Sequence, residues 1–502
     1  MAISSKHPKY IEYATDWDQM NDTYRGERIV KEQGFQYLPA TPGMIEDGVT
    51  NVNSEGFKSY DAYRKRARFS GIVRDAVEAM LGIMHRKPPV IELPAIMEPL
   101  REKATLKNES LEMLLKRINE EQLKTGRCGL LPDLPATPTI QKAVPYLAFY
   151  EAKSIINWDA GRRDGVELES LNLVVLEETE PERQDNFEWK EVQKFRVLIL
   201  GDVQANEGQG FGATYQQGVF REQENFTQDL MIVPSIRGNT LDKIPFTFIN
   251  TKDIVSDPDE PPLLDLSNVA LSIYRSDADY RQALFMQGQD TLVIIGATDD
   301  TNFRTGAGAA ICLDIGGDAK FIGVDSSGLS EMRAAIENDM ALARQKAGQM
   351  INAVSRERES GDALRIRVAS ETATLNQVAI TGAFALQDAL RNIAIWLGGN
   401  PEEVVVTPNL DFVDDPLTGE TLVQYMTAKS LGLPWSLEQI HLHLQKKDLT
   451  ELDFEEEIAK IEEEEQLSIG SSNPDDLEDG DPNNPDDPNE PANDDDPVDD
   501  SA

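Results

Sequence analysis

The sequence predicts an α+β protein in which helices and strands occupy separate segments, and three features carry this prediction. Residues 1 to about 130 show helical periodicity. Residues 140 to 250 are short runs rich in Val, Ile, Phe and Tyr between polar loops. After residue 262, two long helical patterns flank a small β-rich insert. Separate runs of helices and antiparallel strands are typical of the α+β class.

The N-terminal segment contains amphipathic helices. Apolar residues recur there at steps of three and four: Phe69, Val73, Val77, Met80 and Met84. Pro88 and Pro89 end this helix soon after Met84. A second helix is expected over ESLEMLLKRINEEQLKTG, with Gly126 near its end.

The middle segment reads as an antiparallel sheet. The expected strands are YLAFYEAKSIINW (146–158), LNLVVLEE (171–178), KFRVLIL (194–200), GVFRE (218–222) and IPFTFIN (244–250). GQGFG (208–212) fits a hairpin loop, because no strand and helix flank it as a phosphate-binding loop would require.

Two long helices are expected around the insert. The first runs from about 262 to 286, and its apolar stripe is interrupted at Asp277, which suggests partial exposure or an intersubunit contact. Within the insert, 291–296, 309–315 and 320–324 read as strands, and the polar loop 297–308 separates the first two. The second helix starts near Ser327 or Ser330, and its apolar stripe resembles a coiled-coil seam.

The remaining chain alternates between helix and loop. A charged loop precedes a third long helix at 371–397, in which Gly382 suggests a kink. A strand near 402–412 and short helices up to residue 466 follow. Residues 467–502 have almost no apolar side chains, so we expect them to be disordered.

Charge and composition exclude several classes of protein. The 502 residues carry a net charge of −41, and half of it lies in the last 52 residues, with 22 acidic side chains and one lysine. No dense basic patch of the kind found in ordinary nucleic-acid binders is present. No apolar run reaches the length of a membrane span, no secretory signal is apparent, and two distant cysteines indicate a reducing compartment.

The motif search predicts no catalytic residue, no metal and no cofactor. Patterns for a P-loop, a zinc protease helix and a CxxC pair are absent from the sequence. His441 and His443 would point to different faces of a helix, which makes a poor metal site. Cys128 lies beside Arg127, which could lower the pKa of the thiol, but a buried turn is the favoured interpretation of GRCGLLPD.

One basic stretch has two interpretations. It contains Arg344, Lys346, Arg356, Arg358, Arg365 and Arg367, at the end of the second long helix and in the loop after it. These side chains could compensate the helix dipole and pair with neighbours such as Glu359. Alternatively, the loop lies near phosphates.

In their order along the chain, these segments resemble the portal proteins of tailed bacteriophages, in particular a large portal-like family long without an assigned function. The resemblance is carried by YRGERIVKEQGFQYLP (24–39), YRKRARFSGIVRDAVEAMLGIMHRKPP (63–89), TGRCGLLPDLP (125–135), YLAFYEAKSIINW (146–158), VQKFRVLIL (192–200), IPFTFIN (244–250) and PPLLDLSNVALSIYRSDADY (261–280). It spans roughly residues 10 to 465.

The resemblance implies a portal-like fold with a helical and β wing, a two-helix stem, a small α/β clip, a long kinked helix and a helical crown. The corresponding segments are a wing at 1–262, a first stem helix at 263–287, a clip at 288–327, a second stem helix at 328–352, a tunnel loop at 353–370, a long wing helix and strand at 371–416, crown helices at 417–466 and the disordered acidic tail at 467–502.

It also implies a function and partners. A portal is a ring, usually of twelve subunits, at one capsid vertex of the virion, assembled in the host bacterial cytoplasm. It conducts double-stranded DNA without sequence specificity during packaging and ejection. The implied protein partners are the terminase large subunit, a head-completion or adaptor protein, and the major capsid and scaffolding proteins, and no membrane is involved.

Two groups of residues receive expected roles from this resemblance. The expected DNA-tunnel residues are Arg344, Lys346, Arg356 and Arg358. The expected partner-docking residues of the clip are Asp299, Asp300, Asn302 and Arg304. Two other functions stay open at this point: a monomeric acidic adaptor or scaffold protein, and a carboxylate-dependent enzyme.

Overall fold

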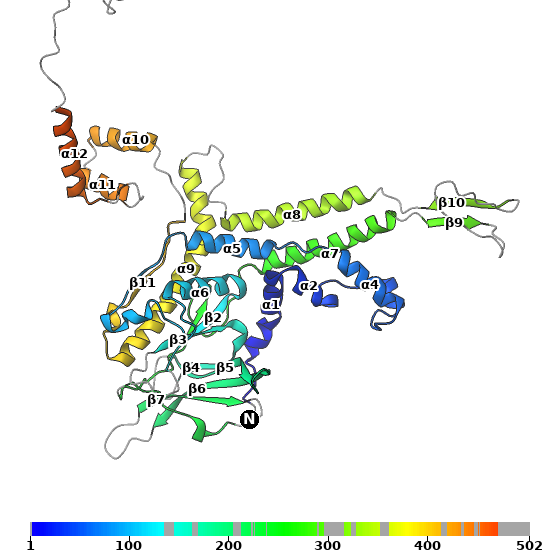
Figure 1. The fold of residues 1–502 in the computed structure, drawn as a ribbon, viewed down its shortest axis with the longest axis horizontal. Coiled ribbons are helices and arrows are strands. Elements are labelled where there is room, and N and C mark those ends of the chain that lie inside the picture. The colour runs from blue at the N-terminus through cyan, green and yellow to red at the C-terminus, as the bar shows by residue number, and fades with distance from the viewer. Residues whose placement is uncertain are drawn as a thin grey trace, which may run out of the picture. The chain divides into compact units, whose positions relative to one another are not determined.

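A computed structural model describes most of the chain, which divides into two compact units, Met1–Val413 and Asp414–Ala502. The described residues are 3–134, 145–162, 169–203, 212–221, 224, 226–236, 238–288, 291–295, 316–322, 328–351, 361–412, 419–432, 436–445, 450 and 452–469. Both helices and sheets are present, which agrees with the expected α+β class (Figure 1). Among the described residues, no helix is long and apolar enough to span a membrane.

The N-terminal segment is helical, as predicted. Its α-helices are α1 (Pro8–Arg25), α2 (Glu27–Glu32), α3 (Pro42–Glu46), α4 (Glu55–Arg66), α5 (Ile72–Met84) and α6 (Leu111–Thr125). The predicted stripe of α5 is buried, including Val73, Val77 and Met80. Helix α6 starts at Ser110, whose side chain accepts a hydrogen bond from the Met113 amide, and ends at Gly126 in the left-handed conformation.

Two antiparallel sheets follow the helices. The larger has the order β4-β5-β6-β7, formed by β4 (Ile155–Arg162), β5 (Glu169–Arg183), β6 (Trp189–Val203) and β7 (Gly212–Arg221). The smaller has the order β3-β2-β8, formed by β3 (Tyr146–Glu151), β2 (Arg127–Asp133) and β8 (Thr247–Asn250). Four of the predicted strand segments each overlap one strand, with shifted ends, whereas 146–158, predicted as one segment, forms β3 and β4 in different sheets.

The expected turn at GRCGLLPD is wrong, because this segment is the buried central strand β2. Its register places Leu130 opposite Phe149 of β3 and Thr247 of β8. Gly129 is required there, since a Cβ would come within 2.3 Å of the Phe246 ring. Burial raises the pKa of the Cys128 thiol well above its ordinary value and outweighs the opposing effect of Arg127.

Two long helices flank a strand pair, as predicted. They are α7 (Leu264–Gln287) and α8 (Leu329–Ile351), which agree within one residue with the expected stem helices at 263–287 and 328–352. Between them, β9 (Thr291–Ile295) pairs antiparallel with β10 (Asp318–Ile322). Thus β10 overlaps the strand expected at 320–324, and the strand expected at 309–315 lies outside the described residues.

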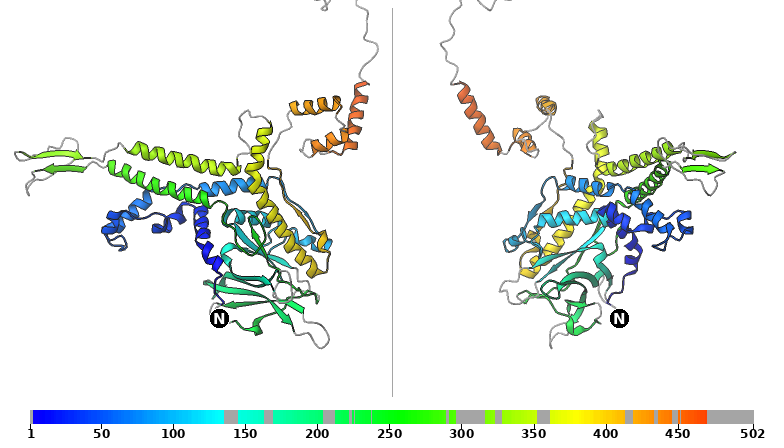
Figure 2. Two further views of the ribbon diagram at one scale, coloured as in Figure 1. Left: turned by 180° about the vertical axis from the view of Figure 1, so that it is seen from behind. Right: turned by 45° about the vertical axis from the view of Figure 1, so that its right-hand side comes forward.

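Helix α9 (Gly361–Leu397) starts earlier than the helix predicted at 371–397, so residues 361–370 of the expected tunnel loop are helical, and residues 353–360 lie outside the described residues. Residues 361–370 are helical, because their Ala, Leu and Arg residues are good helix formers and Asp362 lies in the favourable first turn. Figures 1 and 2 show a change of axis direction along α9. At Gly382, α9 packs closely on α6, since a Cβ added at this position would lie 2.6 Å from Asn119 Nδ2.

The remaining elements close the first unit and form the second. Strand β11 (Val405–Thr407) pairs with β1 (Val90–Glu92), which confirms the strand expected after α9. The second unit contains α10 (Gly419–Ser430), α11 (Leu437–Gln445) and α12 (Phe454–Ile469). Helix α12 extends three residues into the expected tail, which otherwise lies outside the described residues.

Candidate functional site

Helices α7 and α8 form an antiparallel pair that carries β9 and β10 at its far end. Three views show the two helices side by side (Figures 1 and 2). With 24 and 23 residues, each helix is about 35 Å long. The hydrophobic core covers only part of this length, and the end of α7 is exposed.

The first half of α7 is embedded in a helical core. Its buried residues are Leu266, Ser267, Ala270, Leu271, Ile273, Tyr274 and Ala278. They belong to one cluster with residues of α1, α4, α5, α8 and α9. On α8, Ala343 is buried, and Ile336, Met340 and Ala347 pack against the same cluster, so the predicted seam of α8 faces α7. This burial fixes the base of the helix pair on the rest of the unit.

The second half of α7 presents apolar side chains to solvent. Leu284 is 41% exposed, Phe285 40% and Met286 47%. Leu342 on α8 is 43% exposed. Partly exposed apolar side chains therefore occur near the end of α7 and, on α8, four residues before Lys346, which contacts Asp265 at the base of the pair.

Polar side chains of α4 bind α7, and the sequence pattern does not reveal these contacts. The Tyr63 hydroxyl donates to Asp279 Oδ1 at 2.5 Å. Arg66 bonds to Gln282, and its guanidinium carbon lies 4.1 Å from the centre of the Phe285 ring. The basic run YRKRAR was the only available signal, since sequence spacing cannot reveal a partner more than 200 residues away.

Asp277 has its partners within the chain. Its Oδ2 atom accepts from the Arg68 amide and from Arg281 Nε, each at 2.7 Å. Asp277 is partly exposed, as one interpretation of the interrupted stripe expects, and an intersubunit contact at this residue stays a prediction. The apolar stripe of α7 is interrupted at Asp277 because this side chain binds the backbone of Arg68, in the segment that connects α4 to α5.

The predicted tunnel residues Arg344 and Lys346 lie on α8 and differ in their surroundings. Arg344 is exposed and has no hydrogen-bonded or ion-pair partner among the described residues. Lys346 Nζ lies 2.9 Å from Asp265 Oδ2 at the start of α7. Lys346 therefore links the two helices.

Six other predicted site residues lie outside the described residues: Arg356, Arg358, Asp299, Asp300, Asn302 and Arg304. The structure therefore does not test whether the first two approach Arg344. It also does not place the four clip residues relative to β9 and β10. Their roles stay predictions.

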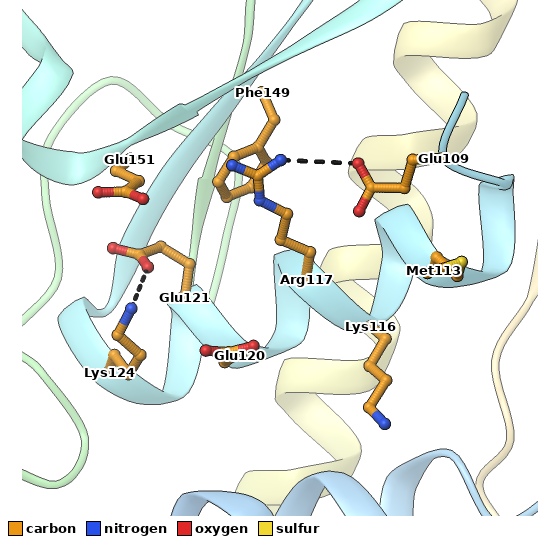
Figure 3. A pocket seen from close by; sticks show the side chains of 9 residues that line it. All are labelled: Glu109, Met113, Lys116, Arg117, Glu120, Glu121, Lys124, Phe149 and Glu151. Atoms are coloured by element: carbon orange, nitrogen blue, oxygen red, sulfur yellow. Dashed lines mark hydrogen bonds and ion pairs between the residues drawn. The ribbon is translucent and has the colours of Figure 1, made fainter. Parts of the chain in front are cut away.

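A hollow of about 310 Å³ between α6 and β3 gathers many charged side chains (Figure 3). The Arg117 guanidinium lies over the Phe149 ring at 4.3 Å and pairs with Glu109 at 3.6 Å. Glu121 and Lys124 form an ion pair at 2.8 Å, and burial raises the pKa of the Glu121 carboxyl. Both ion pairs therefore lie on or just before α6, and the contact of Arg117 with the Phe149 ring joins α6 to β3.

The described residues contain no group of three or more His, Cys, Asp and Glu side chains arranged to hold a metal ion. His441 Nε2 lies 2.9 Å from the Leu452 carbonyl oxygen, so this ring is used for packing between α11 and α12. The α7–α8 pair, with β9 and β10 at its end, is the candidate functional site.

Comparison with known proteins points to the same segment. A family model described as a domain of unknown function, DUF4055, matches residues 262–397, which run from the start of α7 to the end of α9. The search of curated proteins found no match.

Several solved structures show a weak likeness over most of the chain. A protein in the neck of a native GTA particle computed with C12 symmetry has 12% identity and a TM-score of 0.35, covering 76% of this chain and 92% of its own. A protein in the neck of an empty GTA particle computed with C6 symmetry has 13% identity and a TM-score of 0.35, covering 81% and 94%. A protein in the virion of a native gene transfer agent particle has 13% identity and a TM-score of 0.37, covering 80% and 98%. These values are too low to assign a function.

Proposed function

We propose that this chain is a portal protein, a structural subunit of a ring at one capsid vertex of a tailed phage or phage-like particle. In this role it conducts double-stranded DNA during packaging and ejection. Its partners would be further copies of itself, the terminase large subunit, a head-completion or adaptor protein, and capsid and scaffolding proteins. The chain would position DNA and proteins rather than catalyse a reaction.

One observation carries the proposal: α7 and α8 form a long antiparallel pair with an antiparallel strand pair at its far end. Helix α9 then returns the chain to the sheets, where Thr247 Oγ1 on β8 bonds to Asp388 Oδ2 at 2.8 Å. A stem, a clip and a long wing helix in this order are what the sequence resemblance implies.

The exposed surface of the helix pair supports assembly of several copies. Phe285 and Met286 near the end of α7 and Leu342 on α8 lie on a pair whose base is already packed on its own unit. In a ring with cyclic symmetry, one face of each pair would meet a different face of its neighbour. Such contacts would cover the apolar residues that a single chain leaves exposed.

Charge also supports a channel for DNA. Twelve copies at −41 would carry about −490 formal charges. A mostly acidic wall repels phosphates within about 8 Å at physiological salt, so DNA would slide rather than bind tightly. A few cations, among them Arg344, would steady the duplex, because each neutralised phosphate adds affinity.

Mass photometry of the purified full chain tests the proposal across several buffers and salt concentrations. Closed rings of one dominant mass are expected. A stable monomer under all conditions would favour the adaptor hypothesis. Deleting residues 470–502 separates the two further, because a ring should still form without the acidic tail, whereas a tail-dependent adaptor should lose its partner.

The segment between α8 and α9 gives a separate test of DNA contact. Arg356 and Arg358 are changed together to Ala, and ring formation and DNA packaging are both measured. Intact rings with impaired packaging or DNA retention are expected. Normal packaging by this double variant would remove the loop from the proposed tunnel while leaving the ring assignment in place.

A further inference from the structure

The guanidinium of Arg127 is fully buried between aromatic rings at the junction of the two sheets. Its central carbon lies 4.4 Å from the centre of the Trp158 ring and 4.8 Å from that of Phe248. His7 stacks on Trp158 at 4.1 Å. Aromatic faces attract the cation, but they cannot accept its N–H groups in the plane of the guanidinium.

Most of the hydrogen-bonding capacity of Arg127 is unused. Its Nη1 atom reaches Asn250 Oδ1 at a long 3.5 Å. Nε and Nη2 have no hydrogen-bond partner among the described residues. These two groups form the edge that commonly binds a carboxylate through two parallel hydrogen bonds. A buried donor edge of this kind is costly unless an acceptor reaches it.

The loop that leads into α7 is folded around the neighbouring residue Asn250. Asn250 Nδ2 donates to the carbonyl oxygens of Val255 and Asp257 at 3.0 and 2.7 Å. Gly126 lies on the other side of the loop, and a Cβ there would come 3.1 Å from the carbonyl oxygens of Asp259 and Glu260. The 251–262 loop is therefore held against β2 and β8 immediately before α7 begins.

The loop contains four carboxylates, and those of Asp257 and Glu260 have no hydrogen-bond or ion-pair partner among the described residues. Asp253 accepts from Asn250 Nδ2 at 2.9 Å, and Asp259 accepts from the Lys252 amide at 2.9 Å. Asp257 is exposed, and its carboxylate, unlike its backbone carbonyl, accepts no hydrogen bond among the described residues. Burial lowers the pKa of Arg127 to about 9, and Asp257 opposes this more strongly than the other charges.

We propose that Asp257 closes onto the Nε and Nη2 edge of Arg127, and that this ion pair fixes the loop from which α7 leaves the sheets. Arg127 is then a positioning residue for the α7–α8 pair. The backbone carbonyl of Asp257 already accepts from Asn250, and Asn250 itself contacts Arg127, so one side chain connects the two members of the proposed pair. This proposal does not depend on the portal assignment, because it concerns contacts within one chain.

Hydrogen exchange of the full chain, followed by mass spectrometry over residues 251–262 and α7, tests the proposal. Asp257→Asn is expected to accelerate exchange of the loop about tenfold, as expected for loss of a coupled charge pair. Asp257→Glu should restore most of the protection. Asp242→Asn is the matched control, because Asp242 is exposed and has no side-chain partner among the described residues.

The double variant shows whether Asp257 acts through Arg127. In an Arg127→Met background, Asp257→Asn should add little to the exchange rate. A full additional effect would overturn the pairing. Exchange of Asp257→Asn equal to that of Asp242→Asn would overturn it as well, and this comparison decides the matter even where Arg127→Met does not fold.

Discussion

Tyr63 on α4 donates its hydroxyl to Asp279 on α7 at 2.5 Å, across 216 positions of sequence. The contact lies in the half of α7 whose own apolar side chains are largely exposed. Burial and the neighbouring carboxylate raise the pKa of Tyr63, so its hydroxyl stays protonated and remains a donor. This bond therefore braces α7 beyond the region that the helical core covers.

Changing Tyr63 to Phe should loosen α7 from α4. A hydrogen bond to a charged acceptor contributes about 2 kcal/mol, and Asp279 would lose its donor. Hydrogen exchange of α7 measures the change. Tyr280→Phe is the matched control, because the Tyr280 hydroxyl has no partner among the described residues. Equal exchange in the two variants would show that the brace is not needed.

A side chain at Gly382 should destabilise the contact between α9 and α6. In Gly382→Ala, the Cβ would lie 2.6 Å from Asn119 Nδ2 and 2.8 Å from Gln122 Oε1, so both amides would have to move. We expect a loss of about 1–3 kcal/mol in unfolding free energy. Gly82→Ala in α5 is the control, since nothing lies within 4 Å of its Cβ. A gain in stability from both changes would contradict this packing.

His85 should make the protein less stable as the pH falls through about 6.5. Asn119 Nδ2 donates to Gln122 and to the Val378 carbonyl, so Asn119 Oδ1 accepts from His85 Nε2 at 2.9 Å. Burial lowers the pKa of His85 from its ordinary 6.5. The unfolded chain therefore binds the proton first, and protonation favours unfolding below that pH.

Stability curves of wild type and His85→Gln test this effect, because glutamine keeps a donor without titrating. The difference between the two should be constant above about pH 7 and should shift against the wild type below about pH 6.5. Other groups titrate equally in both proteins. Parallel curves over the whole range would mean that His85 does not titrate differently in the folded and unfolded states.

Arg344 and Lys346 should differ in their effect on DNA. Arg344→Ala removes an exposed cation with no partner among the described residues, so DNA retention by assembled particles should fall and its salt dependence should weaken. Lys346→Ala removes the contact to Asp265 and should chiefly loosen the α7–α8 pair. If Arg344→Ala and Lys346→Ala impair packaging equally and leave the α7–α8 pair equally stable, the two residues do not have these separate roles.

The sequence predicted the long elements well and the tertiary partners poorly. Helices α5, α7 and α8 were found because apolar residues at three- and four-residue steps need one buried face. Strand β2 was taken for a turn, since Gly126, Gly129 and Pro132 are turn-forming residues and only the surrounding strands make an extended conformation favourable. The start of α9 is not predictable from local pattern, because the charged residues with Gly361 are also typical of a loop.

The candidate site shows the same division. The order of helix, strand pair and helix could be predicted from local pattern alone. The brace of α7 by Tyr63 and Arg66, and the burial of Arg127, could not, since each depends on residues distant in sequence. The difference between Arg344 and Lys346 also required the structure, because only the position of Asp265 separates them.

Electron microscopy of the purified full chain in negative stain, with two-dimensional class averages viewed along the particle axis, tests the central claim most directly. Closed rings with a central channel and one dominant subunit number are expected. The same rings should form after deletion of residues 470–502. Averages showing only single compact particles at micromolar concentration, in low and high salt, would contradict the portal assignment.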